Sequence, residues 1–299
     1  MGRSFSIQRG TARIVFGAGS GERIAKEIEA LPSPPRRVVV VSTSGRKEMA
    51  TKLAAQLGAR AMGVLTIARE HVPVETVTDA RAAIEKADAE AILAVGGGSA
   101  IGLAKAVAVS FDGPTRLRIV AVPTTYSGSE MTPIFGTTEG GMKKTGRDER
   151  ARPSLVVYDP TLAAGLPRDV AVASIWNALA HAVEALWSPA VDRATFLAAE
   201  EAVRLLAGSV RRLAANPEDA GAREQAFEGA YLAGGAFADA GSGIHHKLCH
   251  VLGGAFALPH AKTHAALLPH VTRWVAGAAP EAMAALARAL GAVDPVAAL

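Results

Sequence analysis

The sequence predicts an α/β domain built on a parallel sheet, followed by an all-α domain. Short β-branched runs alternate with segments of helical period in the first half of the chain. After about residue 160 the strand signals stop and long helical segments follow. The 299 residues, 49% of them hydrophobic, suffice for one large domain or two ordinary ones with sizeable cores. We therefore expect two domains, at residues 1–159 and 160–299.

The elements are expected in a fixed order. Strands should lie near Ala12–Phe16, Arg37–Val41, Met62–Ile67, Ala91–Val95 and Arg118–Val122. These runs are nearly all apolar, so helices should cover both faces of the sheet. Within the first domain, one helix should begin near Ser20, and two others should span Arg46–Leu57 and Val77–Ala89. In the second domain helices should span Ser174–Trp187, Asp192–Ala207, Ala222–Ala238 and Pro280–Leu290, with Ser174 as an N-cap.

Composition excludes several classes of protein. The formal net charge is +4 and the basic residues are scattered, which disfavours a nucleic-acid partner. That mild excess suits an anionic small molecule or a phosphate-bearing cofactor, or is simply a solvated basic surface. No apolar run approaches the roughly 20 residues of a membrane span. The single cysteine, Cys249, fits a reducing compartment, so we expect a cytoplasmic protein.

The glycine-rich motif "AVGGGSAIGLAKAVA" runs from Ala94 to Ala108. An expected strand ends at Val95, three glycines turn the chain, and a helix begins near Ser99. Glycines let the backbone approach a ligand closely, and a helix N-terminus offers unpaired N–H groups. Gly96, Gly97, Gly98 and Ser99 are therefore candidates to bind a pyrophosphate. The alternative is a tight turn that only packs a helix on a sheet.

Two other loops follow strand ends of the same expected sheet. In "VPTTYSGSEMTP", Thr124, Thr125 and Ser127 could hydrogen-bond a ribose or a nicotinamide amide, or could be ordinary turn residues. After "RVVVV", Thr43 lies in a stretch of hydroxyl and basic residues that includes Arg46. An NAD-specific enzyme commonly has an acidic residue at such a place. Without it, we expect both NADH and NADPH to be used.

Half of the eight histidines lie in "SGIHHKLCHVLGGAFALPH", residues 242–260. His246 and His250 are four residues apart and share a helix face, as do Asn177 and His181 upstream. A lone histidine on an apolar helix is usually a core residue. Several that converge from two segments indicate a site for a metal ion or for proton transfer.

Four motifs occur in order over most of the chain: "GGGSAIGLAK", "PTTYSGSE", "NALAHAVEA" and "HKLCHVLGGAFALPHA". In these motifs the chain resembles the iron-containing (group III) alcohol dehydrogenase family. The resemblance implies a dehydroquinate-synthase-like fold with an N-terminal dinucleotide-binding domain. In metal-dependent members one aspartate and three histidines hold Fe²⁺ or Zn²⁺. Those positions are here Asn177, His181, His246 and His260, with His250 as a nearby non-ligand.

Asn177 replaces the aspartate, and an amide offers a cation only a neutral oxygen. We therefore expect no metal, although three histidines alone can hold zinc. Further departures are Gly102, where the family commonly has aspartate, and the stretches "HVPVETV", "GMKKTGRD" and "HHKLCH". All match one branch, the maleylacetate reductases. The branch implies reduction of the C=C of 2-maleylacetate to 3-oxoadipate with NADH or NADPH, in bacterial degradation of aromatic compounds.

A metal-free pocket for this small dicarboxylate needs hydrogen-bond and proton donors. By the resemblance and this chemistry, the candidates are His181, His245, His246, Lys247, His250, His260 and Asn177. His250 is the first choice of proton donor and His246 the second. Lys247 and His245 could pair with a carboxylate, and Asn177 could hydrogen-bond one. The family also implies a homodimer and more C-terminal helix than this chain has.

Three alternatives stay open. A metal-dependent alcohol dehydrogenase acting on a small alcohol or aldehyde would hold stoichiometric Fe or Zn and lose activity with EDTA. A relative of dehydroquinate synthase or glycerol-phosphate dehydrogenase would require an acidic metal ligand, which Asn177 is not. A non-catalytic protein that kept the dinucleotide fold would show no turnover.

Overall fold

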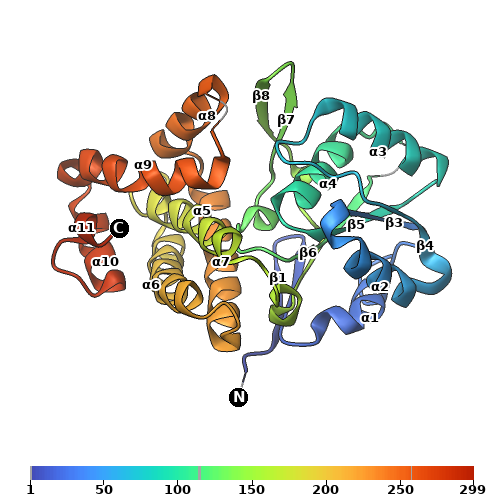
Figure 1. Cartoon of the computed structure of the whole chain (residues 1–299), viewed down its shortest axis with the longest axis horizontal. Coiled ribbons are helices and arrows are strands. Elements are labelled where there is room, and N and C mark those ends of the chain that lie inside the picture. Colours follow the sequence, from blue (N-terminus) through green and yellow to red (C-terminus); the bar gives the residue numbers. More distant parts are fainter. Residues whose placement is uncertain (1, 114–115, 257) are drawn as a thin grey trace. The chain divides into compact units, whose positions relative to one another are not determined.

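A twisted, mostly parallel sheet dominates the first part of the computed structural model, which describes residues 2–113, 116–256 and 258–299 (Figure 1). Its strands are Phe5–Arg9 (β1), Ala12–Phe16 (β2), Val38–Ser42 (β3), Ala61–Leu65 (β4), Ala91–Gly96 (β5), Arg118–Pro123 (β6) and Leu155–Tyr158 (β9). They form one seven-stranded sheet in the order β1-β2-β9-β6-β5-β3-β4. Only the β1–β2 pair is antiparallel.

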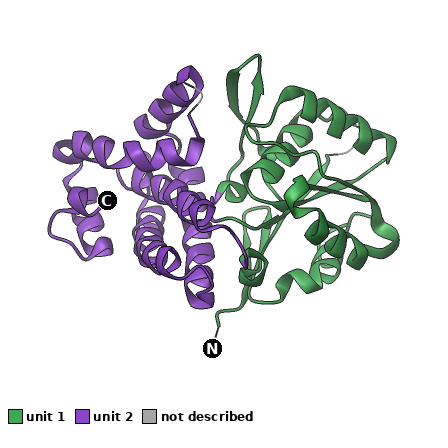
Figure 2. Ribbon diagram, viewed as in Figure 1, with its two compact units in different colours: residues 1–125, 129–163 green, residues 126–128, 164–299 purple. Residues whose placement is uncertain are grey.

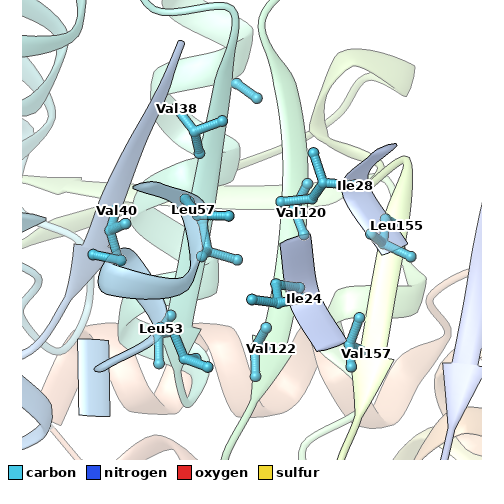
Figure 3. Close-up of a cluster of buried hydrophobic side chains, with 14 of the residues drawn as sticks. Ile24, Ile28, Val38, Val40, Leu53, Leu57, Val120, Val122, Leu155 and Val157 are labelled. Carbon is cyan, nitrogen blue, oxygen red and sulfur yellow. The ribbon is translucent and has the colours of Figure 1, made fainter. Parts of the chain in front are cut away.

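Helices cover both faces of this sheet, as the apolar strands predicted. On one face, α1 (Ile24–Glu29) and α2 (Lys47–Leu57) bury their apolar side chains against the central strands (Figure 3). Leu53 and Leu57 pack there with Val38 and Val40. Each such fully buried aliphatic side chain stabilises the fold by about 1.5–3 kcal/mol. Alternate residues of β3 face the opposite side, and they are buried as well.

The helix that follows the glycine motif lies against the sheet centre. It is α4 (Gly98–Ser110), and it contacts β3, β5 and β6. The neighbouring helix α3 (Val74–Lys86) packs beside it. Since β3, β5 and β6 are parallel, their carboxyl ends meet at one edge of the sheet.

A hairpin that the sequence did not predict follows the second polar loop. Strands Ile134–Glu139 (β7) and Met142–Arg147 (β8) pair antiparallel around Gly140 and Gly141, whose φ angles of 54° and 80° suit glycine. The stretch "GMKKTGRD" belongs to this hairpin. Neither strand is strongly apolar, which is why hydrophobic periodicity did not reveal it.

The rest of the chain is helical. Its elements are Arg168–Leu186 (α5), Arg193–Ala215 (α6), Ala220–Ala240 (α7), Ile244–Phe256 (α8), His260–Val275 (α9), Pro280–Leu290 (α10) and Pro295–Ala298 (α11). Ser174 is not an N-cap, because α5 starts after Pro167 and Ser174 lies inside it. Its hydroxyl donates to the Ala171 carbonyl instead. The motif that joins α8 to α9 includes Ala257, which lies outside the described residues.

The chain divides into two compact units (Figure 2). Unit 1 comprises residues 1–125 and 129–163, and unit 2 comprises residues 126–128 and 164–299. The boundary at residue 160 stays our proposal for where one independently folding domain ends. Throughout the described part of the chain, no helix has the length and apolar character needed to cross a bilayer.

Candidate functional site

The glycine turn after β5 is built so that its backbone can come close to a ligand. Gly96 has a φ of 147°, which glycine tolerates best. A Cβ on Gly97 would lie 2.8 Å from Thr125 Cγ2, so the fold itself requires a glycine there. Gly98, by contrast, begins α4 with no atom within 4 Å of a would-be Cβ. Gly98 and Ser99 thus present the first turn of a long helix to open space.

The second polar loop lies beside the first. Thr124 N donates to the Gly96 carbonyl at 3.0 Å, and Thr124 is buried. Thr43 follows β3, whose end lies at the same sheet edge as that of β5. The structure therefore brings Thr43, Thr124 and Thr125 to the edge that carries the glycines. Their roles with a cofactor remain predictions.

Ser127 belongs to a different environment from the other candidate cofactor residues. The segment Tyr126–Gly128 is part of unit 2 and packs against α5 and α7. Asn177 Nδ2 donates to the Ser127 carbonyl at 3.2 Å. One N–H of the Asn177 amide is thereby engaged, while its Oδ1 is buried without a hydrogen-bond partner among the described residues.

Six histidines from α5, α8 and α9 gather in unit 2: His181, His245, His246, His250, His260 and His264. The His246 ring lies 4.9 Å from that of His181 and 4.6 Å from that of His264, between ring centroids. The His260 ring is 4.5 Å from the His264 ring and 5.9 Å from the His250 ring. The structure thus assembles every histidine that the sequence selected and adds His264.

The most buried members of this cluster are neutral imidazoles. Burial holds the pKa of His246 and His264 well below the usual value, and neighbouring histidines act in the same direction. Burial also lowers the pKa of His245 to about 4. In the part of the chain that the structure describes, Nε2 of His246 and Nε2 of His264 are buried and lack hydrogen-bond partners. Buried polar atoms of this kind indicate a group that the protein chain does not supply.

The two residues proposed to pair with a carboxylate differ from each other. His245 is fully buried, and its Nε2 lies 2.9 Å from His264 Nδ1 and 3.6 Å from Cys249 Sγ. Lys247 lies on the exposed face of α8. Only His245 therefore belongs to the buried cluster.

Sequence reasoning missed two members of the site. Glu184 contacts His246, and His264 contacts both His245 and His246. Helical spacing carried a signal for each of them. Glu184 lies three residues after His181, and His264 lies four residues after His260, so each shares a helix face with a selected histidine.

These residues fit a divalent metal ion. Ligand atoms of His245, His246 and His264 all lie within 4.8 Å of one another. Neutral imidazole is the form that binds a metal, and burial favours it here. Of the positions implied by the family, His246 belongs to this group, and Asn177 adds a buried oxygen without a partner.

Comparisons with known proteins bear on the same residues. Residues 11–160 match the iron-containing alcohol dehydrogenase family model, and residues 171–298 match that of the C-terminal part of the Fe-containing alcohol dehydrogenase family. The chain is 47% identical to the maleylacetate reductase of Sphingobium indicum over 283 residues. That alignment covers 95% of this chain and 78% of the relative.

The expectation of a metal-free site is wrong. Both parts of the chain match an iron-containing family, and the structure gathers histidines that could hold the ion. The expectation rested on Asn177, because an amide offers a cation only a neutral oxygen in place of a carboxylate. The Asn177 nitrogen donates to Ser127, so the amide keeps an acceptor oxygen, which suits a cation.

Solved structures agree with the family models. The crystal structure of maleylacetate reductase from Rhizobium sp. aligns with a TM-score of 0.90 and 40% identity, covering 100% of this chain and 83% of that one. An iron-containing alcohol dehydrogenase from Corynebacterium glutamicum aligns with a TM-score of 0.89 and 39% identity, over 99% and 82% of the two chains. The chain therefore belongs to the iron-containing alcohol dehydrogenase family.

Proposed function

We propose that this protein reduces the C=C bond of 2-maleylacetate, giving 3-oxoadipate. One observation carries the proposal: 47% identity over 95% of the chain to a relative named maleylacetate reductase. The fold and the two sheet-edge loops are consistent with such an oxidoreductase. Bacterial degradation of aromatic compounds is the proposed setting, because the resemblance to the maleylacetate reductases implies it.

The reaction needs one hydride and one proton. NADH or NADPH, held by the sheet-edge loops, would supply the hydride to the carbon β to the ketone, and negative charge would then develop on the ketone oxygen. Asn177, His181, His246 and His260 are the positions that would hold iron, and a bound divalent iron polarises such an oxygen as a Lewis acid. His250 is not among these four positions and stays our first choice for the proton donor, whereas His246, the second choice from the sequence, could not donate a proton while it holds the ion.

Substrate binding calls for donors to two carboxylates. Lys247 stays our candidate for a carboxylate at the exposed side of α8. His245 is buried, so it would act on a substrate carboxylate indirectly, through its contact with His264.

For the cofactor, we propose that Gly96, Gly97, Gly98 and Ser99 bind the pyrophosphate, with Thr43, Thr124, Thr125 and Ser127 around the ribose and nicotinamide. The open space at Gly98 and the N-terminus of α4 support the first part. Hydroxyl and basic residues after β3 support the use of both NADH and NADPH. The single cysteine supports a cytoplasmic location, and the family resemblance supports a homodimer.

An anaerobic assay on the full chain tests the proposal. The protein, loaded with Fe²⁺, is mixed with NADH or NADPH and 2-maleylacetate, and loss of the reduced cofactor is followed by absorbance. Turnover to 3-oxoadipate is expected with both cofactors. No turnover with either would refute the proposal. A hundredfold preference for NADH, about 2.7 kcal/mol, would refute dual cofactor use alone.

An alcohol or aldehyde substrate is the alternative. The 39% identity to an iron-containing alcohol dehydrogenase favours it. The same sample therefore receives small alcohols with NAD⁺ and small aldehydes with NADH. Faster turnover of these substrates than of 2-maleylacetate would select the alternative.

A further inference from the structure

Behind His246 lies a buried carboxylate that no sequence argument had selected. Glu184 comes from α5 and is 1% exposed. Its Oε2 lies 2.5 Å from Nδ1 of His246, which is 3% exposed. The two side chains thus form a hydrogen-bonded pair from which water is excluded.

The other oxygen of Glu184 fixes how the carboxylate is oriented. Oε1 accepts from the backbone N of His245 at 2.7 Å and from that of His246 at 3.3 Å, both in the first turn of α8. A Cβ on Gly243 would lie 2.7 Å from this oxygen, so a glycine is needed for the carboxylate to approach. Burial raises the pKa of Glu184, and these backbone donors act against that rise. The geometry fixes the orientation of the carboxylate: Oε1 faces the two α8 amides and Oε2 faces His246 Nδ1.

We propose that Glu184 is a positioning residue: it holds the His246 proton on Nδ1 and leaves the Nε2 lone pair for a metal ion. Within the described residues Nε2 has no hydrogen-bond partner, so a lone pair there is available to a cation. Carboxylates that accept the second N–H of a ligating histidine orient the ring and raise its basicity. This inference rests on the proposed metal-dependent function.

One substitution reverses the proposed proton position. In Glu184→Gln the side-chain oxygen must keep accepting from the two α8 amides, so the NH₂ group faces His246 Nδ1. That group can only donate, which forces the His246 proton onto Nε2 and occupies the lone pair. Glu184→Asp keeps the charge on a shorter side chain. Glu281→Gln makes the same chemical change at a carboxylate whose side chain is 77% exposed, and it serves as the matched control.

The first measurement uses the metal-free full chain with ¹⁵N-labelled histidine. Imidazole nitrogen shifts distinguish the two neutral tautomers. We expect His246 to be protonated on Nδ1 in the wild type and in Glu281→Gln, and on Nε2 in Glu184→Gln. A wild-type His246 protonated on Nε2 would overturn the inference, and this result does not require any variant to fold.

The second measurement is the affinity for Zn²⁺, used as a redox-inert probe. We expect Glu184→Gln to weaken Zn²⁺ binding about 10–100-fold, and Glu184→Asp to weaken it less. The Tm of the metal-free variants shows whether they fold. Zn²⁺ binding within twofold of wild type in a folded Glu184→Gln would overturn the inference.

The two proposals fail in different ways. A wild type that binds Zn²⁺ and has the Nδ1 proton, but does not turn over 2-maleylacetate, contradicts the proposed substrate and leaves Glu184 supported. A wild type that turns over 2-maleylacetate with the proton on Nε2 contradicts the role of Glu184 alone.

Discussion

Each unit of the chain buries a cluster of polar side chains, and the two clusters differ in how their hydrogen bonds are satisfied. In unit 1, Lys105 Nζ contacts the carbonyls of Ser129, Thr132 and Ile134 and the Thr132 hydroxyl, at 2.5–3.1 Å. In unit 2, nitrogens of His245, His246 and His264 are buried with no partner in the described chain. A buried cation whose N–H groups are all accepted by the protein stabilises the fold, whereas an open cluster such as these histidines is held by the fold for a ligand.

Removing Nε2 of His246, which has no partner in the described chain, should have the largest effect, and this effect should be on catalysis. In His246→Asn the shorter amide can still donate to Glu184 but has nothing at the position of Nε2. We expect kcat/KM for 2-maleylacetate to fall about 10³-fold, roughly 4 kcal/mol, with little change in Tm. His270→Ala, at an exposed position of α9, is the control and should be fully active. An active His246→Asn would mean that the open cluster is not the site.

Replacing Lys105, whose ammonium group is fully hydrogen-bonded by the protein, should lower stability instead. Lys105→Met removes the ammonium group that donates to three carbonyls, so we expect the free energy of unfolding to fall by about 3 kcal/mol. Urea unfolding followed by circular dichroism measures it. The control is Lys86→Met, at an exposed lysine near the end of α3. Equal stability of the two variants would show that the Lys105 contacts contribute little.

The same lysine predicts a pH dependence. Burial lowers the pKa of Lys105 to about 7 from its ordinary 10.5, although the charge of Glu130 acts in the opposite direction. Between these values the unfolded chain holds a proton that the folded chain has released, so stability rises with pH. We expect the wild type to gain free energy of unfolding from pH 7 toward 10.5 relative to Lys105→Met. Parallel pH profiles would contradict this.

Backbone packing beside the open cluster gives a smaller effect. A Cβ on Gly234 of α7 would collide with the Gly128 carbonyl, in the segment whose Ser127 holds Asn177. We expect Gly234→Ala to lower the free energy of unfolding by about 1–3 kcal/mol and to reduce activity. Gly208→Ala, on α6, meets nothing within 4 Å and should stabilise by about 0.4–1 kcal/mol. Chemical denaturation of both variants tests the difference.

The smallest effect is expected at the sheet edge, where Arg46 is partly exposed. If Arg46 contacts the 2′-phosphate of NADPH, Arg46→Ala should raise KM for NADPH about tenfold, or 1.4 kcal/mol, and leave KM for NADH unchanged. Arg60→Ala, at the opposite edge before β4, is the control. Equal changes in both KM values would remove Arg46 from cofactor selection.

Local sequence patterns anticipated the sheet better than the hairpin. The β-branched runs around Val38–Ser42 and Ala91–Gly96 are apolar throughout, and turn residues bound them, so strands were recognised. The hairpin Ile134–Arg147 mixes polar and apolar residues, so neither of its strands shows hydrophobic periodicity. Its structure comes from the pairing of the two strands with each other. The start of α5 was misplaced because Pro167, not Ser174, precedes its first turn.

The sequence by itself determined the kinds of ligand groups: glycines after a buried strand, and histidines at helical spacing. The turn preferences of glycine and the spacing of residues on a helix involve only a few consecutive residues. A single segment of the sequence is therefore enough to predict them. Only the tertiary structure decided that Glu184 meets His246, 62 residues away, and that Asn177 keeps an acceptor oxygen rather than a donor. Those outcomes depend on how α5 packs against α8 and against Ser127, since the protonation and hydrogen bonding of a buried group follow from its neighbours in space.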